Sequence, residues 1–365
     1  MSVKVIISGG GTGGHIFPAI SIANEIQKRQ VDSEILFVGA KGRMEMEKVP
    51  KAGYPIIGLT ISGLQRNWRN LKNLLFPIKL ILSLWKSYQI IKQFKPTVVV
   101  GTGGYASGPL LYVASKLSIP ALIQEQNSFP GITNKLLSAS VQKICVAYDK
   151  MDRFFPKDKL LMLGNPVRQD LIDCHKIKRK GLKTFNIDEN KAVVLVVGGS
   201  LGARTINQSV AKIVHELDKN GIQLIWQTGT SYEHQARKIC ETLPHAQTYP
   251  FIYEMNLAYS VADIIISRAG ASTISELCLV GKPAILIPSP NVAEDHQTKN
   301  AQALVDKKAA IMIRDSDAVN QLGTQIMALF ENEHQQNELA KNIQSLAITN
   351  SSEMIVDEVF KLIEA

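Results

Sequence analysis

The stretch Val3-Lys4-Val5-Ile6-Ile7-Ser8 is followed directly by Gly9-Gly10-Gly11-Thr12-Gly13-Gly14-His15, and the arrangement returns half a chain later. There, Val193-Val194-Leu195-Val196-Val197 precedes Gly198-Gly199-Ser200-Leu201-Gly202-Ala203-Arg204. A short apolar run is typical of a buried parallel strand, and glycines after it let the backbone turn sharply and approach a ligand. A helix that begins there directs free N–H groups and its positive dipole end at the ligand, which suits a phosphate. The two turns predict two similar nucleotide-type domains.

The domain organisation follows from the same alternation along the chain. A length of 365 residues allows two domains of ordinary size. Apolar runs alternate with helical stretches in both halves, which predicts an α/β fold with two parallel sheets covered by helices on both faces. Gly164-Asn165-Pro166 is a natural break, so we expect domains over 1–164 and 165–339. The amphipathic end, about 340–365, can pack on either domain, and a return to the first is our expectation.

Composition and charge narrow the class of protein. The four cysteines are scattered without a C-x-x-C pair, which favours a reducing cytosol, and we expect neither a signal peptide nor a membrane-spanning helix. The net charge of +9 is concentrated in the first half. No acidic residue occurs between Glu47 and Glu125, whereas those 77 residues contain ten Lys or Arg. A basic face of this kind implies an anionic partner: nucleic acid, anionic lipid or a phosphorylated substrate.

Two common nucleotide-binding classes are disfavoured. Gly9, Gly11 and Gly14 satisfy G-x-G-x-x-G, but a dinucleotide site needs an acidic residue where the second strand ends. That strand ends Leu36-Phe37-Val38-Gly39-Ala40, without an acid. No G-K-[ST] follows any glycine turn, which argues against a P-loop ATPase.

His15 is the candidate for proton transfer. It closes the first glycine turn at the expected start of a helix, where the alternative role is simply to cap that helix. A histidine can take a proton from a hydroxyl at cytosolic pH. A further glycine turn, Gly101-Thr102-Gly103-Gly104-Tyr105-Ala106-Ser107-Gly108, follows Val98-Val99-Val100 in the same half. The first domain therefore offers two neighbouring anion-friendly turns.

In the second half, Ser267-Arg268-Ala269-Gly270 leads into an expected helix that carries Glu276 in its first turn. The pattern is compatible with an ordinary N-terminal cap and a first-turn acid. It also fits a helix start that holds a diphosphate while Glu276 accepts hydrogen bonds from ribose. We interpret Asp315-Ser316-Asp317 as helix capping rather than as a metal-binding D-x-D, and expect no metal site.

The stretch 66–86 is more apolar than one helix face requires. Lys72, Lys79 and Lys86 recur every seven residues, and Trp85 lies among large aliphatic side chains. An ordinary core helix with a solvated lysine stripe is one interpretation. A helix with an apolar excess, an interfacial tryptophan and a cationic edge also suits an anionic membrane surface.

Taken jointly, these motifs resemble the MurG family of bacterial N-acetylglucosaminyltransferases. The resemblance covers about 300 residues and also includes Glu125-Gln126-Asn127, Gly164-Asn165-Pro166-Val167-Arg168 and Gln297 with Asn300. It implies two Rossmann-like domains facing a cleft, the GT-B fold. It implies UDP-GlcNAc as donor and undecaprenyl-pyrophosphoryl-N-acetylmuramoyl-pentapeptide (lipid I) as acceptor. The new β-1,4 bond would form at the C4 hydroxyl of the acceptor, with inversion at the anomeric carbon of the donor. The product would be lipid II for peptidoglycan, and the reaction would need neither a cofactor nor an obligatory metal.

The resemblance also implies which residues bind the donor, UDP-GlcNAc. They are Thr12, Gly13, Gly14 and Asn127 from the first half, and Arg168, Ser200, Ile252, Ala271, Ser272, Thr273, Ile274, Ser275, Glu276 and Gln297 from the second. Ile252 would read uracil through its backbone. His296 departs from the family pattern, which often has a second Gln before Gln297.

The function expected from these patterns is therefore glycosyl transfer at the cytoplasmic face of the inner membrane, with His15 as the base. The protein would be peripheral, bound to the anionic membrane surface through about residues 66–86, and would have no nucleic-acid partner. Two alternatives remain: a UDP-GlcNAc 2-epimerase, and a non-catalytic nucleotide-binding module that docks on the membrane.

Overall fold

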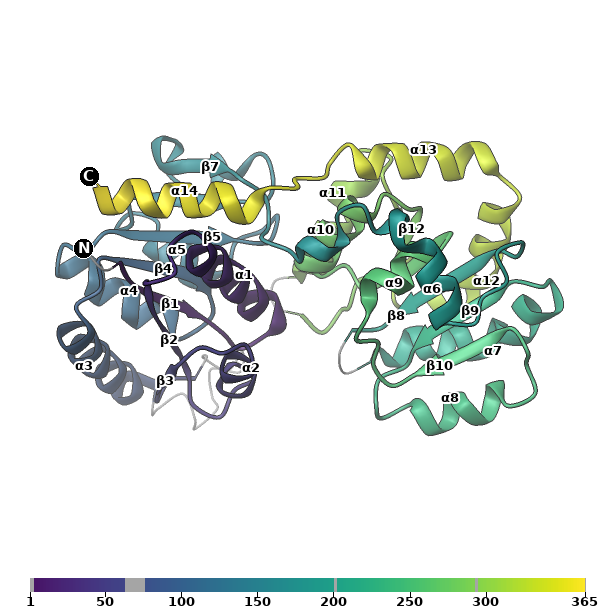
Figure 1. Cartoon of the computed structure of the whole chain (residues 1–365), viewed down its shortest axis with the longest axis horizontal. Coiled ribbons are helices and arrows are strands. Elements are labelled where there is room, and N and C mark those ends of the chain that lie inside the picture. Colours follow the sequence, from purple (N-terminus) through teal and green to yellow (C-terminus); the bar gives the residue numbers. More distant parts are fainter. Residues whose placement is uncertain (1–2, 63–75, 200–201, 293–294, 365) are drawn as a thin grey trace. The chain divides into compact units, whose positions relative to one another are not determined.

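The computed structural model describes residues 3–62, 76–199, 202–292 and 295–364. Its internal contacts divide the chain into two units, 1–167 with 350–365, and 168–349. Each unit is built on one parallel sheet (Figure 1). The domain limits expected from the sequence, at residues 164 and 339, stay a prediction.

The sheet of the first unit has seven strands in the order β3-β2-β1-β4-β5-β6-β7. The strands are β1 (Lys4–Gly9), β2 (Glu34–Ala40), β3 (Ile56–Leu59), β4 (Val98–Gly103), β5 (Ala121–Glu125), β6 (Lys143–Val146) and β7 (Leu160–Met162). All neighbours are parallel, and Ile6 of β1 lies opposite both Leu36 and Val99. From β1 the chain winds first toward β3 and then, from β4, toward β7. The switch point of this sheet therefore lies between β1 and β4.

Helices cover both faces of this sheet because successive strand residues alternate between two apolar clusters. Ile6, Val99 and Ile123 belong to a cluster with α3 (Phe76–Phe94), α4 (Ser107–Lys116) and α5 (Ile132–Leu137). Val5 and Val98 belong to the other cluster. That cluster includes α1 (Gly13–Arg29), α2 (Glu45–Lys51) and α14 (Ser351–Glu364).

The end of the chain differs from the single amphipathic stretch expected over about 340–365. Two helices form instead, α13 (Glu333–Gln344) and α14, and they belong to different units. Helix α14 packs on α1: Ile355, Val356 and Val359 are fully buried, and Arg29 of α1 forms an ion pair with Asp357. The expectation of one helix is wrong because Thr349-Asn350-Ser351 interrupts it with residues that favour a helix start over a helix interior.

The sheet of the second unit has six parallel strands in the order β10-β9-β8-β11-β12-β13. They are β8 (Val193–Val197), β9 (Gln223–Gln227), β10 (Ala246–Tyr249), β11 (Ile264–Ser267), β12 (Ala284–Leu286) and β13 (Ile311–Met312). The winding direction reverses between β8 and β11, as it does between β1 and β4. This likeness confirms the expected pair of Rossmann-like parallel-sheet domains.

Helices also cover both faces of the second sheet. One apolar cluster includes α7 (Arg204–Lys219), α8 (Glu233–Cys240) and α12 (Ala318–Phe330). The other includes α6 (Lys178–Thr184), α9 (Met255–Val261), α10 (Ala271–Val280) and α11 (His296–Val305). Helix α13 contributes Leu339 to the first cluster and Ile343 to the second. Short 3₁₀ turns lie at Met151–Arg153, Lys157–Lys159, Gln169–Leu171 and Cys174–Ile177.

Candidate active site

The glycine turns singled out in the sequence lie at the switch points of the two sheets. In open α/β sheets, ligands bind outside the carboxyl ends of the strands at such points. In the first unit, the turns after β1 and β4 pack backbone to backbone. Gly104, at φ +91°, is so close to Gly10 that a Cβ there would lie 2.4 Å from the Gly10 carbonyl oxygen. Only glycine fits this approach, and it brings Thr12 and the start of α1 to the same edge of the sheet as β4.

His15 lies in the first turn of α1, half-buried, beside three groups that fix it. Its Nδ1 is 2.8 Å from the side-chain oxygen of Gln126. The Thr102 hydroxyl donates to the His15 carbonyl oxygen over 2.8 Å. The ring covers Gly103, where a Cβ would lie 2.8 Å from ring atoms. Thr12, the cap residue of α1, is exposed, and Gly13 and Gly14 are partly exposed.

Asn127 belongs to a loop that is held by the buried carboxylate of Glu125. One Glu125 oxygen accepts from the backbone N–H and side-chain amide of Asn127, at 3.0 and 3.2 Å. The other accepts from the Gly131 N–H at 3.1 Å and from the Asn134 amide at 2.8 Å. With both oxygens engaged in this way, Glu125 acts as a loop anchor and is a poor alternative to His15 as a base.

A second buried carboxylate, Glu45, supports the first glycine turn. It accepts from the N–H of Gly11 and the N–H of Ala40, each at 2.9 Å. A Cβ at Gly10 would lie 2.2 Å from a Glu45 oxygen, so a larger residue there would displace the carboxylate that binds the turn. The acid that a dinucleotide site would place at the end of β2 thus occurs five residues later. It is fully buried under the turn and cannot hold a ribose.

In the second unit, Gln227 connects the glycine turn after β8 to Ile252. Its amide donates to the Gly199 carbonyl at 3.1 Å, and its oxygen accepts from the Ile252 N–H at 2.9 Å. The Ile252 N–H is therefore already engaged within the protein. Gly202, at φ +77°, leaves room for the Thr228 carbonyl, which a Cβ would meet at 2.2 Å. Ser200 lies outside the described residues.

The start of α10 carries polar atoms that the protein does not satisfy. Arg168 Nε lies 3.7 Å from a Glu276 oxygen, too far for a hydrogen bond, and Tyr259 donates to the other Glu276 oxygen at 3.3 Å. Among the described residues, Arg168 Nε and Nη2 and the Ser272 hydroxyl are buried without any hydrogen-bond partner. Native proteins rarely leave such groups unpaired, so the two residues are candidates for contact with a ligand. Glu276 lies in the second turn of α10, not in the first as expected, because the helix already begins at Ala271. It shares a helix face with Ser272 at i and i+4.

Burial raises the pKa of the Glu276 carboxyl, against the opposing effects of Arg168 and the Tyr259 hydroxyl. Burial also raises the pKa of Tyr259 well above its ordinary value, and the adjacent Glu276 adds to that effect. The remaining residues of the predicted run, Ala271 to Ser275, form the first turns of α10, where Ala271 and Ile274 face the core. The cluster therefore combines a guanidinium that lies near Asp170 and Glu276, without a hydrogen bond from Nε or Nη2, with a carboxyl that a hydroxyl donor would stabilise in its charged form.

Gln297, near the start of α11, accepts from the Ser289 N–H at 2.8 Å, which leaves its amide group to donate. The Asp315-Ser316-Asp317 stretch has two roles. Asp317 is the N-cap residue of α12, as expected, although its side chain makes no capping hydrogen bond. Asp315 instead accepts from Thr205 at 2.8 Å and forms an ion pair with Arg268, which also donates to the Ile287 carbonyl at 3.0 Å. Arg268 and Asp315 thus join the ends of β11, β12 and the start of α7. In the part of the chain that the structure describes, no cluster of residues has the composition of a metal site.

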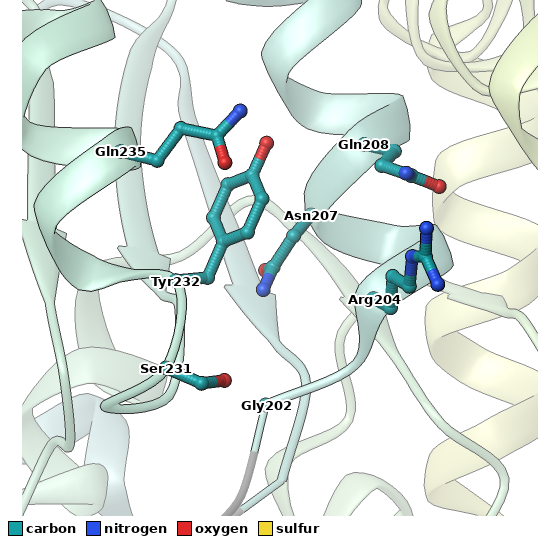
Figure 2. A pocket seen from close by; sticks show the side chains of 7 residues that line it. All are labelled: Gly202, Arg204, Asn207, Gln208, Ser231, Tyr232 and Gln235. Carbon is teal, nitrogen blue, oxygen red and sulfur yellow. The ribbon is translucent and has the colours of Figure 1, made fainter.

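A separate hollow of about 440 Å³ lies between the starts of α7 and α8 (Figure 2). Arg204, Asn207 and Gln208 of α7 line one side, and Tyr232 and Gln235 line the other. It borders the glycine turn at Gly202 but lies on the β9 side of α7. The predicted donor residues instead flank the switch point between β8 and β11.

Sequence reasoning missed three residues that organise these turns: Glu45, Gln126 and Gln227. Each contacts a loop that is distant in sequence, so no local spacing marks it. Gln126 stands inside a motif that carries the family resemblance, but its partner His15 is 111 residues away. The sequence offers one signal for such residues: an acid or amide that adjoins the end of a buried strand.

Two parallel-sheet domains with glycine turns at their switch points, together with the family models that match them, define a class: a two-domain glycosyltransferase of the GT-B type. Models of the glycosyltransferase family 28 N-terminal and C-terminal domains match residues 5–146 and 193–357. The chain therefore belongs to glycosyltransferase family 28 and, within it, to the MurG family.

Individual relatives of this chain support its membership of the MurG family. A Flavobacterium psychrophilum protein is 54% identical over 99% of this chain and 98% of its own length. It is named UDP-N-acetylglucosamine–N-acetylmuramyl-(pentapeptide) pyrophosphoryl-undecaprenol N-acetylglucosamine transferase, as is a Bacteroides thetaiotaomicron protein, 52% identical over 100% and 98%. The crystal structure of Acinetobacter baumannii MurG is 29% identical with a TM-score of 0.81, over 98% of this chain and 99% of that one. A Neisseria meningitidis UDP-GlcNAc 2-epimerase, 15% identical with a TM-score of 0.68 over 99% and 100%, shares the fold alone.

Proposed function

We propose that this chain transfers N-acetylglucosamine from UDP-GlcNAc to the C4 hydroxyl of N-acetylmuramic acid in lipid I, which yields lipid II. The full-length similarity to transferases of that name carries the proposal. It disfavours the epimerase, whose structures resemble this chain in fold only. It also disfavours the non-catalytic module, because both glycosyltransferase domains are present.

The proposed chemistry inverts the anomeric centre in one displacement. His15 Nε2 takes the proton of the acceptor hydroxyl while that oxygen attacks the anomeric carbon. The bond to UDP breaks, and the diphosphate oxygen leaves with the electron pair. Negative charge develops on that oxygen, and donors placed in advance stabilise it. The N–H groups at the start of α10, with Arg168, are suited to this role.

The donor site is proposed around α10 because that region holds the unsatisfied Arg168 and Ser272 atoms. Glu276 would accept from ribose hydroxyls, and the Ile252 carbonyl would accept from uracil. Gln297, whose oxygen already binds Ser289, would donate its amide hydrogens to the sugar. Ser200, Ala271, Thr273, Ile274 and Ser275 would complete this side of the site. Thr12, Gly13, Gly14 and Asn127 would contact the donor from the first unit.

Membrane contact is proposed through α3. Ile78, Ile81, Leu82 and Trp85 are each at least half exposed, at the i, i+3, i+4, i+7 spacing of one helix face. Ser83, Ser87, Ile90 and Ile91 bury the opposite face. An exposed aliphatic stripe with a tryptophan, on a domain rich in Lys and Arg, suits insertion into an anionic interface. Residues 66–75 of the predicted segment lie outside the described part of the chain.

The proposed location is peripheral, at the cytoplasmic side of the inner membrane, where a polyprenyl acceptor would be reached. None of the helices in the described ranges is long and apolar enough to cross a bilayer. The basic charge of the first half is assigned to anionic lipid and to the phosphorylated acceptor, and we propose no nucleic-acid partner and no cofactor.

One incubation tests the proposal. UDP-GlcNAc labelled in the sugar is incubated with the full chain, with and without a short-chain lipid I analogue. The transferase predicts labelled disaccharide product and free UDP only with the analogue. Conversion of the donor to its 2-epimer would support the epimerase, and an unchanged donor in both arms would support the binding module.

A further inference from the structure

The side chain of Gln126 occupies the position that decides which nitrogen of His15 is free. It is 1% exposed and lies after β5, whereas His15 lies after β1. Because an imidazole can react through either nitrogen, the partner of one nitrogen determines the availability of the other.

The orientation of the Gln126 amide is fixed by backbone carbonyls. Its Nε2 donates to the Thr102 carbonyl at 2.8 Å and to the Gln124 carbonyl at 3.1 Å. A carbonyl oxygen can only accept, so the NH₂ end must face these two groups. A flipped amide would direct its oxygen at two carbonyl oxygens in a buried site. The Gln126 oxygen is therefore the atom that faces His15.

Two further amides reinforce this orientation. Asn165 donates its amide hydrogen to the Gln126 backbone carbonyl at 3.1 Å, and its side-chain oxygen accepts from Gln124 Nε2 at 2.8 Å. The Gln124 side-chain oxygen is thereby directed at Gln126 Nε2, with which it is hydrogen-bonded. The network joins β5 to the segment after β7, and each orientation follows from a backbone group.

We infer that Gln126 is a positioning residue: it accepts a hydrogen bond from Nδ1–H of His15 and so presents Nε2 as the proton acceptor. An amide oxygen cannot donate, so Nδ1 must carry the proton at the observed 2.8 Å. Neutral His15 then has its lone pair on Nε2. When Nε2 takes a proton, the Nδ1–H bond to Gln126 persists, so the protein need not reorganise. The hydrogen bond from the Thr102 hydroxyl and the close packing on Gly103 hold His15 in place.

The carboxylates of the adjoining loops do not compete for this role. Glu45 accepts from the Gly11 and Ala40 amides. Glu125 accepts from Asn127, Gly131 and Asn134. The partner of His15 is thus a neutral amide rather than a carboxylate. It fixes the tautomer without adding negative charge beside a phosphorylated substrate.

This inference rests on the proposed role of His15, so the first test does not use activity. The full chain is labelled with ¹⁵N-histidine, and the His15 signals are assigned by comparison with His15→Ala. Wild-type His15 should show a protonated Nδ1 and an unprotonated Nε2 in the neutral form, and Gln126→Met should abolish that signature. A protonated Nε2 in wild type, or an unchanged spectrum in Gln126→Met, overturns the inference.

The second test is a double-mutant cycle in the transferase assay. Gln126→Met should lower kcat at least about tenfold in wild type and less than about twofold in His15→Ala, because its effect passes through the imidazole. Gln126→Glu, which keeps an acceptor but adds charge, should restore activity in part and move the acidic limb of the kcat–pH profile to higher pH. Equal losses from Gln126→Met in both backgrounds would mean a merely structural role.

A matched control separates this effect from damage to the fold. Gln223 is 4% exposed and also makes two backbone hydrogen bonds, with Asp188, in the second unit. Gln223→Met should cost similar stability but leave kcat and the His15 spectrum unchanged. A defective His15→Ala with an undisturbed Gln126→Met overturns only this inference. A fully active His15→Ala overturns the proposed base as well.

Discussion

The glycine turn after β1 and the glycine turn after β8 follow the same strand–turn–helix design but are supported by different chemistry. The first packs against another glycine turn, has the Gly11 amide occupied by Glu45, and ends in an imidazole oriented by Gln126. The second is braced by the neutral amide of Gln227, and its unit also holds a cluster in which Arg168 Nε and Nη2 and the Ser272 hydroxyl have no hydrogen-bond partner among the described residues.

The difference shows how one fold serves two tasks. In the first unit the Gly11 N–H is already bound to Glu45, and the turn ends in the imidazole that we propose as the base. In the second unit the Arg168 guanidinium, the Ser272 hydroxyl and the start of α10 suit an anionic nucleotide. We therefore expect substitution of His15 to affect mainly kcat, and substitution of Glu276 to affect mainly the donor KM.

The largest expected effect is at His15. His15→Ala should lower kcat by about 10²–10⁴-fold, because general-base catalysis contributes on that order. UDP binding, measured by calorimetry, should stay within about twofold. A comparable loss of UDP affinity would instead make His15 part of the donor site and would remove the distinction between the two turns.

Glu276 should give the opposite pattern. Glu276→Ala removes an acceptor for ribose hydroxyls, and a hydrogen bond to a charged group is worth about 1.5–3 kcal/mol. The donor KM should therefore rise about 10–100-fold while kcat at saturating donor changes little. Glu254→Ala, which removes a more exposed carboxylate of the same unit, is the matched control. An unchanged KM would remove Glu276 from the nucleotide site.

Backbone contact between the two turns of the first unit can be tested by a pair of glycines. Gly104 and Gly53 have φ of +91° and +90°, but only Gly104 has a backbone carbonyl within reach of an added Cβ. Both Gly→Ala changes carry left-handed strain, and Gly104→Ala should cost about 1–3 kcal/mol more because the turns must separate. Urea unfolding measures the difference. Equal destabilisation would mean that the close approach of Gly10 and Gly104 contributes nothing.

The sequence predicts the central strands because fully buried strands are unbroken apolar runs. Strand β8 has the bounds of the apolar run Val193 to Val197. The switch points follow only from the strand order in the structure. The sequence does not predict α6, whose charged residues and central Gly181 lack apolar periodicity. It identifies His15 and Glu276 because helix starts leave local signatures. It cannot identify Glu45, Gln126 or Gln227, whose roles arise only when loops from different strands meet.

The two units should also differ in membrane binding, which we assign to the first unit alone. Ile81→Glu with Trp85→Glu should reduce co-sedimentation with anionic vesicles about tenfold or more, because two apolar contacts are lost and two negative charges are added. Val31→Glu with Tyr253→Glu adds the same charge at exposed apolar positions outside α3 and should bind as wild type. Equal binding of all three proteins would place the membrane contact elsewhere.

The smallest expected effect concerns the stability of the second unit without ligand. Burial raises the pKa of Glu276 above its ordinary value of 4.5, so the folded state holds that proton more tightly than the unfolded state. Its contribution to the free energy of unfolding is therefore greatest at acid pH and declines as the pH rises from about 4.5 through the folded pKa.

Glu276→Gln cannot ionise and should escape this decline in stability. The Tm of Glu276→Gln minus that of wild type should grow between pH 4.5 and neutrality, and saturating UDP should reverse the order, since only the charged carboxylate holds ribose strongly. Parallel Tm curves across that interval would show that Arg168 and Tyr259 compensate fully for the burial of Glu276, and the second site would then be poised for its ligand without any cost to the unliganded fold.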